Sequence, residues 1–562
     1  MRDCGGEYMA IDYDKLSREE LVEMVHSYSL RTKFGLVWED NPEEIVEFSK
    51  KNLPYLVFDE KKSFSSKKRL ERNILLEGDN YQSLLALTAT HAGKIDCIYI
   101  DPPYNTGAKD WIYNNDYVDS NDTYRHSKWL SMMKNRLQLA KMLLKEDGVL
   151  ICAIDENEFP RIWLLLEQIF ISHELHCITI VHNPRGTQGS NFSNTHEYAI
   201  FVIPRGIKTI SKQPKEEVSF RNFRRDGIES ERNFAKNCFY PIIVRENEIV
   251  GFGEVIDSAE HPTKNVKVGK DTYVYPIDNK GIERKWGYAR QTVEPKLPQL
   301  RAKTAKSGLI EIEMGRESGV YKTHWIDSRY DANQWGTKLL EALVPENSFD
   351  FPKSIWTTYD CISAAVRDRK EAIVLDFFAG SGTSGHAVQV LNSEDNGSRT
   401  FILCTNNEND IASKVTQKRL DAPRKKVQGF EEITELDFNL IYLKVETLLK
   451  SQNYDENIIQ FSEKVSEYIK LIEQTYALEL KNDIFEVYKS DSKCVGIYTS
   501  LDPKDLCILR EHLNKSQVIK VVYIATLDRE GIQEFDLHEW EGIEVKTMPN
   551  EILSRLDVNS DN

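Results

Sequence analysis

The sequence predicts an α/β protein with a mainly parallel sheet, a second domain inserted into the sheet-forming part of the chain, and an appendage after it. Three observations predict this architecture. Between residues 73 and 204, apolar runs of strand length alternate with segments of helical periodicity. The alternation is lost between residues 205 and 345 and resumes at residue 373. Two of the apolar runs end directly in loops built from proline or glycine, where open α/β sheets bind ligands.

The composition is that of a globular protein. A chain of 562 residues, with 40% hydrophobic and 29% charged residues, should hold roughly three or four structural units. No apolar run is long enough to span a bilayer, and the N-terminus lacks the apolar stretch of a secretory signal, so we expect a cytoplasmic protein. The nine cysteines include no Cys-x-x-Cys pair, so we expect neither a disulfide framework nor a metal site.

The first half of the α/β unit is expected in residues 73–204, after a helical lead-in over residues 1–72. In the lead-in, Leu16, Leu21 and Val25 recur near helical spacing. The apolar runs that follow are residues 73–76, 95–100 and 149–154, and an amphipathic helix is expected over residues 129–144. Strand, helix and strand in this order indicate a parallel sheet.

The sheet is expected to be completed by residues 346–430, which contain apolar runs at 373–378 and 401–405. Residues 205–345 are interpreted as the inserted domain, since basic and aromatic residues mix there with turn formers. Residues 431–562 are interpreted as an α/β appendage, with a strand near residues 518–524, that contacts a second copy or another partner. We expect the aliphatic positions from Leu440 to Leu449 to serve in core or dimer packing.

The residues from Phe378 to Gly385 form a glycine-rich loop where an apolar run turns into a helix. Its glycines let a ligand lie against bare backbone. Glu408 follows the next apolar run, where a carboxylate can accept hydrogen bonds from both hydroxyls of a ribose. Read alone, the glycines also fit a dinucleotide fingerprint or a structural turn, so a nicotinamide or flavin oxidoreductase stays an alternative. A phosphate-binding P-loop fits worse, because His386 stands where its Lys is needed.

The tetrapeptide Asp101-Pro102-Pro103-Tyr104 follows the apolar run at residues 95–100. Two prolines fix two φ angles and remove two amide donors, so the loop presents a carboxylate and carbonyl oxygens in a preset arrangement. The Asp101 carboxylate and the Pro102 carbonyl can each accept one hydrogen of an amino group. Tyr104 can stack on a base that has left its duplex. The alternative is a rigid surface turn, which the flanking apolar run and the glycine loop disfavour.

At these two motifs the sequence resembles the β-group of amino-methyltransferases, in which the catalytic tetrapeptide precedes the donor-binding glycine motif. The resemblance runs from about Lys33 to Leu420. It implies a Rossmann-like sheet that binds S-adenosylmethionine and a methyl transfer to an exocyclic amino nitrogen in DNA. The residues that it implies as catalytic are Asp101, Pro102, Pro103 and Tyr104. The residues that it implies at the methyl donor are Asp79, Lys353, Phe378, Ala379, Gly380, Gly382, Thr383 and Glu408.

Further segments extend the resemblance. Gly78-Asp79-Asn80 is similar to the acidic turn near the donor's adenine, and Asn105-Thr106-Gly107 to the extension of the catalytic motif. In Phe351-Pro352-Lys353-Ser354, which is similar to the segment before the glycine loop, Lys353 would lie near the donor's carboxylate, although Ser354 replaces the family's usual second Pro. The remaining similar positions are Trp129, Arg136 and Leu137, Asp147-Gly148, Asn183, and His196-Glu197.

Within this group the chain most resembles the modification subunit of Type III restriction-modification systems. That resemblance implies N6-methyladenine as the product at a short asymmetric site in double-stranded DNA, a homodimer, and a helicase-nuclease restriction subunit as partner. Asp101 favours adenine, because cytosine enzymes of the group more often have Ser at this position. The alternatives that stay open are an orphan or regulatory adenine methyltransferase, a cytosine-N4 methyltransferase, and the dinucleotide-dependent oxidoreductase.

The inserted domain is the candidate for recognition of the DNA target. A net charge of −16 disfavours indiscriminate binding to nucleic acid, so the contacts must come from a local basic patch. Arginine and lysine neutralise phosphates, and an arginine in the major groove reads guanine. The candidate residues, which alternate with aromatic residues, are Arg221, Arg224, Arg225, Arg284, Lys285 and Arg290. A solvated charged face is the alternative for each of them.

Overall fold

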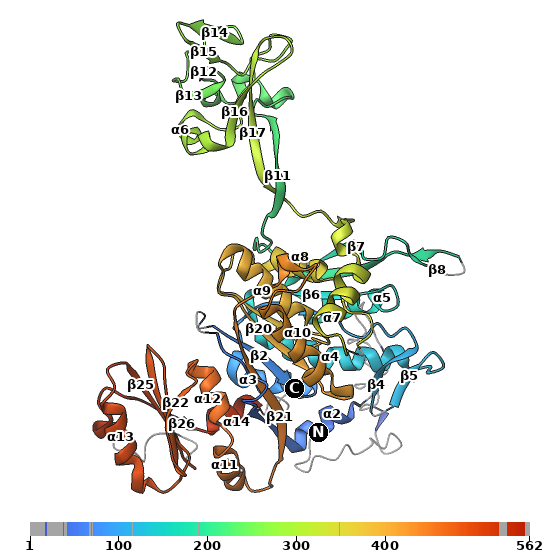
Figure 1. Cartoon of the computed structure of the whole chain (residues 1–562), viewed down its shortest axis with the longest axis vertical. Helices are drawn as coiled ribbons and strands as arrows, with labels where there is room; N and C mark the ends of the chain where they lie inside the picture. The colour runs from blue at the N-terminus through green and yellow to red at the C-terminus, as the bar shows by residue number, and fades with distance from the viewer. Residues whose placement is uncertain are drawn as a thin grey trace. The chain divides into compact units, whose positions relative to one another are not determined.

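The computed structural model describes residues 17–18, 38, 42–66, 69, 71–114, 116–188, 191–347, 349–527 and 537–556. The helix expected around Leu16 to Val25 falls outside these residues, apart from positions 17 and 18. The chain forms two compact units, one of Met1–Ile210 with Lys322–Asn562 and the other of Ser211–Tyr321 (Figure 1). Among the described helices, none is long and apolar enough to cross a membrane.

The larger unit is built on a ten-stranded sheet with the order β1-β21-β2-β20-β19-β3-β6-β10-β7-β18. Its centre is parallel and consists of β2 (Arg72–Glu77), β20 (Thr400–Thr405), β19 (Ile373–Asp376), β3 (Ile95–Ile100) and β6 (Leu144–Ile154). Beyond β6 lie β10 (His196–Pro204), antiparallel to both neighbours, and β7 (His173–Val181). The predicted Rossmann-like α/β fold is thus confirmed.

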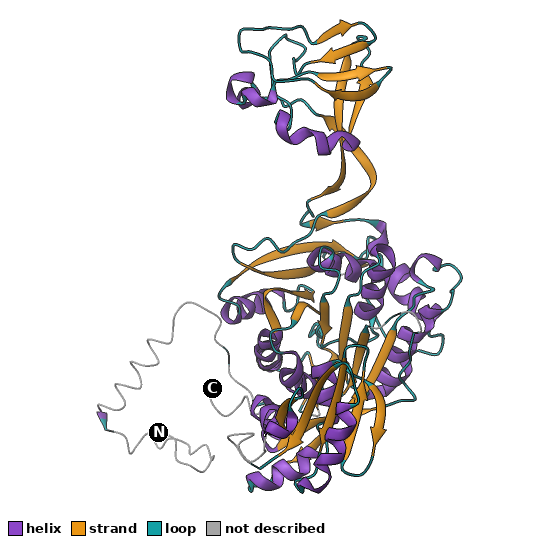
Figure 2. Ribbon diagram, turned by 90° about the vertical axis from the view of Figure 1, so that its left-hand side faces the viewer, coloured by secondary structure: helices purple, strands orange, loops and turns teal. Residues whose placement is uncertain are grey.

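Helices surround this sheet (Figure 2). The helices α3 (Asn80–His91), α4 (Arg125–Leu143) and α5 (Phe159–Ile169) connect strands of the first half of the chain. In the second half, α8 (Ile355–Val366) precedes β19 and α9 (Thr383–Asp395) follows it. Fully buried apolar side chains such as Leu84, Trp129 and Leu137 join helices and strands in one core. Each side chain of this size contributes about 2 kcal/mol on burial, so the strand ends beside the core are held firmly.

The prediction of a helical lead-in up to residue 72 is wrong for residues 52–58. Helix α2 (Glu44–Lys51) ends there, and β1 (Asn52–Phe58) pairs antiparallel with β21 (Asn439–Leu449), which also pairs in parallel with β2. Leu53 and Leu56 of β1 are buried in the core. The large sheet therefore includes residues 439–449, which the sequence analysis assigned to the appendage. The assignment was wrong because the pairing of strands almost 400 residues apart leaves no local signal in the sequence.

The inserted unit is shorter than the predicted residues 205–345. It begins at Ser211 and ends at Tyr321, because β18 (His324–Trp325) already pairs with β7, and α7 (Lys338–Leu343) lies in the larger unit. One of its sheets consists of β11 (Gln213–Asn222), β17 (Ile310–Gly319) and β16 (Leu300–Thr304). The other consists of β13 (Glu248–Phe252), β12 (Ile242–Arg245), β15 (Asp271–Val274) and β14 (Asn265–Val268).

The C-terminal appendage contains a five-stranded sheet and belongs to the larger unit. The strands are β22 (Ala477–Lys481), β23 (Phe485–Lys489), β24 (Lys493–Tyr498), β25 (Ile519–Ala525) and β26 (Glu544–Met548). Tyr468, on α12 (Ser466–Glu473), donates a hydrogen bond to the Pro54 carbonyl at 2.8 Å. Arg555, on α14 (Asn550–Leu556), donates to the Ala89 carbonyl on α3 at 3.3 Å. These contacts tie the appendage to β1 and α3.

Candidate active site

The two sequence motifs lie side by side at the carboxyl ends of two central strands of the large sheet. Strands β3 and β19 are parallel neighbours, with Ile98 opposite Leu375. Asp101 directly follows β3, and the glycine-rich loop directly follows β19. The carboxyl ends of adjacent parallel strands open to the same side, where open α/β sheets bind their ligands. The fold therefore brings together the two loops that the sequence identified separately.

Buried side chains form hydrogen bonds with the loop that contains Asp101. Trp129, on α4, donates its indole N–H to the Pro103 carbonyl at 2.7 Å. Asn105, fully buried with a positive φ of 56°, donates its side-chain amide to Glu158 at 2.5 Å. Trp111, on β4 (Ala108–Tyr113), donates to the Asn105 side-chain oxygen at 3.0 Å. Trp129 thus holds the tetrapeptide at Pro103, and Glu158 and Trp111 hold the adjoining Asn105.

Asp101 lies in a cluster of charged groups that come from three distant segments. The Lys353 ammonium is 3.4 Å from the Asp101 carboxylate and forms a closer ion pair with Glu197, on β10. The Tyr104 hydroxyl accepts a hydrogen bond from Lys353 and donates one to Glu197 at 3.0 Å. The exposed fractions are 25% for the Asp101 side chain, 13% for Lys353 and 4% for Glu197. Of the three, Asp101 is the group that a ligand reaches.

Burial and neighbouring charges shift the pKa values within this cluster. Burial raises the pKa of Asp101 to about 6; Lys353 opposes the rise and Glu197 adds to it. Burial would also raise the pKa of Glu197, but the Lys353 charge and hydrogen bonds outweigh burial and hold it below its ordinary value. Burial would lower the pKa of Lys353, but the two carboxylates keep it above its ordinary value. At neutral pH the cluster therefore holds two carboxylates around one ammonium.

The glycine-rich loop has backbone conformations that suit glycine. Gly380 has a φ of +48° and Gly382 a φ of +84°, the left-handed region that other residues rarely adopt. Asp376, at the end of β19, accepts hydrogen bonds from the Phe378 amide at 2.9 Å and from the Ser384 hydroxyl at 2.5 Å. Burial raises the pKa of this carboxyl to about 7. Gly380, close to the start of α9, is half-buried, and the ring of Phe349 lies against one side of it.

Two acidic groups follow the neighbouring strands β2 and β20. Asp79 caps the start of α3, where its carboxylate accepts a hydrogen bond from the Tyr81 amide at 2.7 Å. Glu408 follows β20 and is exposed. Asn80 donates to the Phe377 carbonyl at 3.0 Å, which connects the first turn to the glycine loop. The glycine loop and the carboxylates of Asp79 and Glu408 follow neighbouring strands, and carboxylates can accept hydrogen bonds from the hydroxyls of a ribose. The residues present therefore fit S-adenosylmethionine.

In the structure the Lys353 ammonium contacts Asp101 and Glu197. A contact of Lys353 with the carboxylate of the methyl donor, which the sequence resemblance implied, stays a prediction. Sequence reasoning also assigned no role to Asp376 or to the Asn105–Glu158 pair. Asp376 lies two residues before the glycine loop, at the end of an apolar run, and this position was a usable signal. Glu158 carried no signal, since it lies 53 residues from Asn105.

The candidate DNA-binding residues of the inserted unit differ in how they are engaged. Arg221 and Arg225 are exposed, and Lys285 is half-buried. Arg284 instead pairs with Asp278 at 3.0 Å and donates to the Gly227 carbonyl at 2.7 Å. Contacts within the unit also engage Arg224, which pairs with Asp226 at 3.3 Å, and Arg290, which donates to the Gly253 carbonyl at 2.7 Å. Only part of the predicted basic set is therefore available to phosphates.

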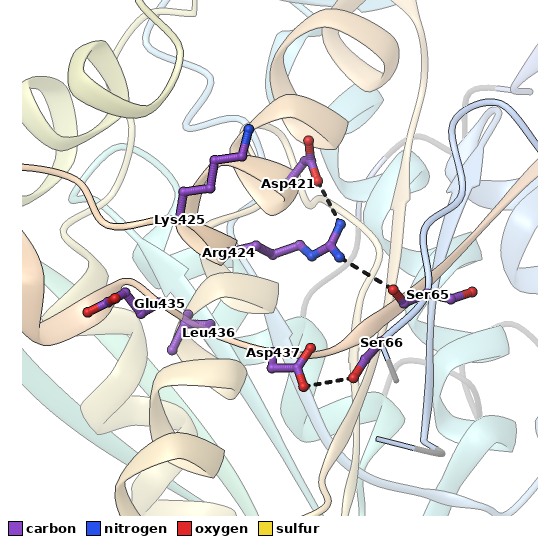
Figure 3. A pocket seen from close by; sticks show the side chains of 8 residues that line it. All are labelled: Ser65, Ser66, Asp421, Arg424, Lys425, Glu435, Leu436 and Asp437. Carbon is purple, nitrogen blue, oxygen red and sulfur yellow. Dashed lines mark hydrogen bonds and ion pairs between the residues drawn. The ribbon is translucent and has the colours of Figure 1, made fainter. Parts of the chain in front are cut away.

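A surface pocket of about 520 Å³ on the larger unit contains none of the predicted site residues (Figure 3). Its lining residues are Ser65, Ser66, Asp421, Arg424, Lys425, Glu435, Leu436 and Asp437. Within it, Arg424 pairs with Asp421 at 3.0 Å, and Ser66 donates to Asp437 at 2.8 Å. These contacts satisfy much of its polar lining, so the strand-end cluster is the stronger candidate for chemistry.

Comparison with known proteins gives consistent matches. Residues 95–415 match the family described as DNA methylase. Over 377 residues the chain is 30% identical to the Type II methyltransferase M.KpnI of Klebsiella pneumoniae, a match that covers 64% of this chain and 84% of that protein. It is 27% identical over 387 residues to the EcoPI Mod subunit of Escherichia phage P1, a Type III restriction-modification enzyme, and 30% identical over 414 residues to the StyLTI Mod subunit of Salmonella typhimurium. These two matches cover 60% and 66% of this chain, but only 58% of each Mod subunit.

Proposed function

We propose, from the premise that the chain belongs to the DNA methylase family, that it methylates the N6 amino group of adenine at a short site in double-stranded DNA, with S-adenosylmethionine as the methyl donor. One observation carries the proposal. The proline-locked Asp101 follows β3, next to the glycine loop that follows β19, so an acceptor of amino hydrogens adjoins a donor-binding loop. The same premise excludes the dinucleotide-dependent oxidoreductase.

The residues that would hold the methyl donor lie along the strand ends. The backbone at Gly380 and Gly382 would contact it, Glu408 would accept hydrogen bonds from its ribose hydroxyls, and Asp79 would lie near its adenine. When bound, S-adenosylmethionine supplies a methyl group on a positively charged sulfonium. The buried cluster of Asp101, Lys353 and Glu197 carries one net negative charge at neutral pH, which favours a cation beside it.

Asp101 acts on the amino group of the target base. Its ionised carboxylate and the Pro102 carbonyl each accept one amino hydrogen, which lets the nitrogen lone pair leave the plane of the ring. When the nitrogen has been methylated, its surplus proton passes to Asp101, whose pKa of about 6 lets it release the proton to water at neutral pH. Tyr104 stacks on the flipped base, with its ring oriented by the hydrogen bond to Glu197.

The resemblance to Mod subunits supports a finer proposal. The chain would be the modification subunit of a Type III system, would form a homodimer, and would associate with a helicase-nuclease restriction subunit. Ser211–Tyr321 would read the target site. An orphan methyltransferase is the second candidate, since the match covers 84% of the Type II enzyme M.KpnI but 58% of the Mod subunits. Co-purification with the product of a neighbouring helicase-nuclease gene would distinguish the two.

The experiment that tests the activity uses the purified full chain, labelled S-adenosylmethionine and genomic DNA. We expect label in DNA as N6-methyladenine at one sequence, read by methylation-sensitive sequencing. Asp101→Ala should abolish the transfer while donor binding, measured by calorimetry, persists. Full transfer by Asp101→Ala would disprove the role of Asp101, and N4-methylcytosine as the product would disprove the choice of base.

A further inference from the structure

The Lys353 ammonium lies between two carboxylates in the candidate active site: the buried Glu197 and the partly exposed Asp101. Lys353 precedes α8, Glu197 lies on β10, and Asp101 follows β3, so three separate segments bring these charges together. The Lys353 ammonium is closer to Glu197 than to Asp101, which is 3.4 Å away. The Lys353 charge therefore interacts more strongly with Glu197 than with Asp101.

Unequal sharing matters because Asp101 has two tasks in the proposed reaction. A carboxylate held in a tight ion pair is a weak proton acceptor, and its oxygens are occupied by the cation. A carboxylate that faces only another carboxylate in a buried site instead takes up a proton and loses its acceptor capacity. The longer contact with Lys353 avoids both extremes.

Glu197 contacts two members of this cluster directly. Its carboxylate pairs with the Lys353 ammonium and accepts a hydrogen bond from the Tyr104 hydroxyl at 3.0 Å. The Glu197 side chain is 4% exposed and does not compete with Asp101 for a ligand. It can therefore act on the reaction through Lys353, through Tyr104 and through its own charge near Asp101.

We propose that Glu197 is a positioning residue for methyl transfer: it draws Lys353 away from Asp101 and fixes Tyr104, so that the Asp101 oxygens stay out of a tight ion pair, remain able to accept a proton, and face the amino group of the base. The inference rests on the proposed function and adds to it the residue that controls the protonation of Asp101. The proton lost by the amino nitrogen goes to Asp101, and Glu197 takes no part in that transfer.

Other titratable groups also face the cluster of Asp101, Lys353 and Glu197. They are Tyr99, Cys152, Asp155, His182, Cys361 and Asp376. Burial raises the pKa values of the tyrosine and of both thiols and lowers that of His182, so these four groups are neutral near pH 7. Burial raises the pKa of Asp155 to about 6 and that of Asp376 to about 7, so both titrate in the range of the assay.

The test compares the pH dependence of the single-turnover methylation rate in two variants. In Glu197→Gln, Lys353 pairs with Asp101 alone, so the acidic limb of the profile should move to lower pH by about one unit, and the rate at pH 8 should fall roughly tenfold. In Lys353→Met, Asp101 faces Glu197 without a cation, so the limb should move to higher pH by about one unit. Lys353 also lowers the pKa of Asp155, so Lys353→Met should raise that pKa as well, and the shift to lower pH in Glu197→Gln is the outcome specific to Asp101 and Glu197.

Controls separate this role from loss of structure. Glu174→Gln removes an exposed carboxylate on β7 that pairs with His176 at 3.3 Å, and it should leave the profile unchanged. Lys353→Arg keeps the charge and should keep the acidic limb within a few tenths of a unit. If Glu197→Gln fails to fold, Glu197→Asp takes its place, because the shorter side chain lengthens the contact with Lys353 and should move the acidic limb in the same direction.

The outcomes are distinct from those that test the function. If the unaltered chain transfers no methyl group to DNA, the proposed function fails. If the unaltered chain is active but both variants lose rate without moving the acidic limb, or move it in the same direction, the inference about Glu197 is wrong. Opposite shifts support it.

Discussion

The ring of Phe349 lies directly against Gly380: a Cβ atom on this glycine would be 2.9 Å from the Phe349 Cζ atom. The same glycine has a φ of +48°, so a side chain there meets both backbone strain and a steric clash. Phe349 precedes Lys353 by four residues. One short segment thus borders the glycine loop at one end and contacts Asp101 at the other.

Gly380→Ala should therefore weaken binding of S-adenosylmethionine. We expect a dissociation constant raised about tenfold or more, measured by calorimetry, because about 1.4 kcal/mol of strain and clash falls on the donor loop. Gly93→Ala is the matched control, since Gly93 has a φ of +64° but open space where its Cβ would lie. The control should lose stability and keep donor affinity. Equal donor affinity in both variants would contradict a role of Gly380 at the donor.

Substitution of Lys353 tests whether its ammonium pairs with Asp101 or with the carboxylate of the methyl donor. Because two carboxylates already engage it, we expect Lys353→Gln to leave donor affinity within about twofold, and to reduce the methylation rate. Glu408→Gln is the comparison, since loss of the exposed carboxylate should weaken donor binding through the ribose hydroxyls. A tenfold loss of donor affinity in Lys353→Gln would instead favour the contact with the donor's carboxylate that the sequence resemblance implied.

The elements that the sequence predicted well are those whose signal is local. Strand β3 spans the same residues, 95–100, as the predicted apolar run, because each of its six side chains is buried. The glycine loop was recognisable because positive φ angles at Gly380 and Gly382 require that residue type. The sequence pattern that predicts each of these features lies within about ten consecutive residues.

The elements that the sequence missed depend on distant partners. Strand β1 reads as part of a helical lead-in until Leu56 is seen opposite Val445 of β21. Glu197 was marked by the family resemblance but received no role, and only the fold brings it to Lys353, 156 residues later. Charge clusters of this kind are built by topology, so single-sequence reasoning finds their members only when a motif already marks them.

The stability of the C-terminal sheet should depend on pH through Glu473. This buried carboxylate contacts Lys493, Lys546 and the Tyr523 hydroxyl, each at 2.7 Å. Burial would raise its pKa, but the hydrogen bonds from these partners and the Lys546 charge lower it to about 2. A depressed pKa stabilises the folded state fully above the ordinary value of 4.5, and this stabilisation is lost as the pH falls towards 2.

Glu473→Gln should therefore reduce the free energy of unfolding by about 3 kcal/mol at pH 7 and flatten its decline between pH 4.5 and pH 2. Urea unfolding followed at each pH measures both effects. Glu479→Gln, at an exposed carboxylate that pairs with Lys489 at 3.2 Å, should change the stability by less than about 1 kcal/mol. An unchanged slope in Glu473→Gln would show that other groups control the acid sensitivity of the sheet.

The arginines of the inserted unit should separate into contacts with DNA and contacts within the fold. Arg225 is exposed, so Arg225→Ala should weaken DNA binding and reduce the slope of log affinity against log salt by about 0.9, the value for one lost phosphate contact. Arg290 donates to the Gly253 carbonyl at 2.7 Å and pairs with Glu294 at 3.1 Å. Arg290→Ala should therefore lower the melting temperature and leave the salt slope unchanged. Fluorescence anisotropy over a range of salt concentrations, with thermal unfolding in parallel, distinguishes the two classes. A reduced slope in Arg290→Ala with full stability would move Arg290 into the DNA-binding class.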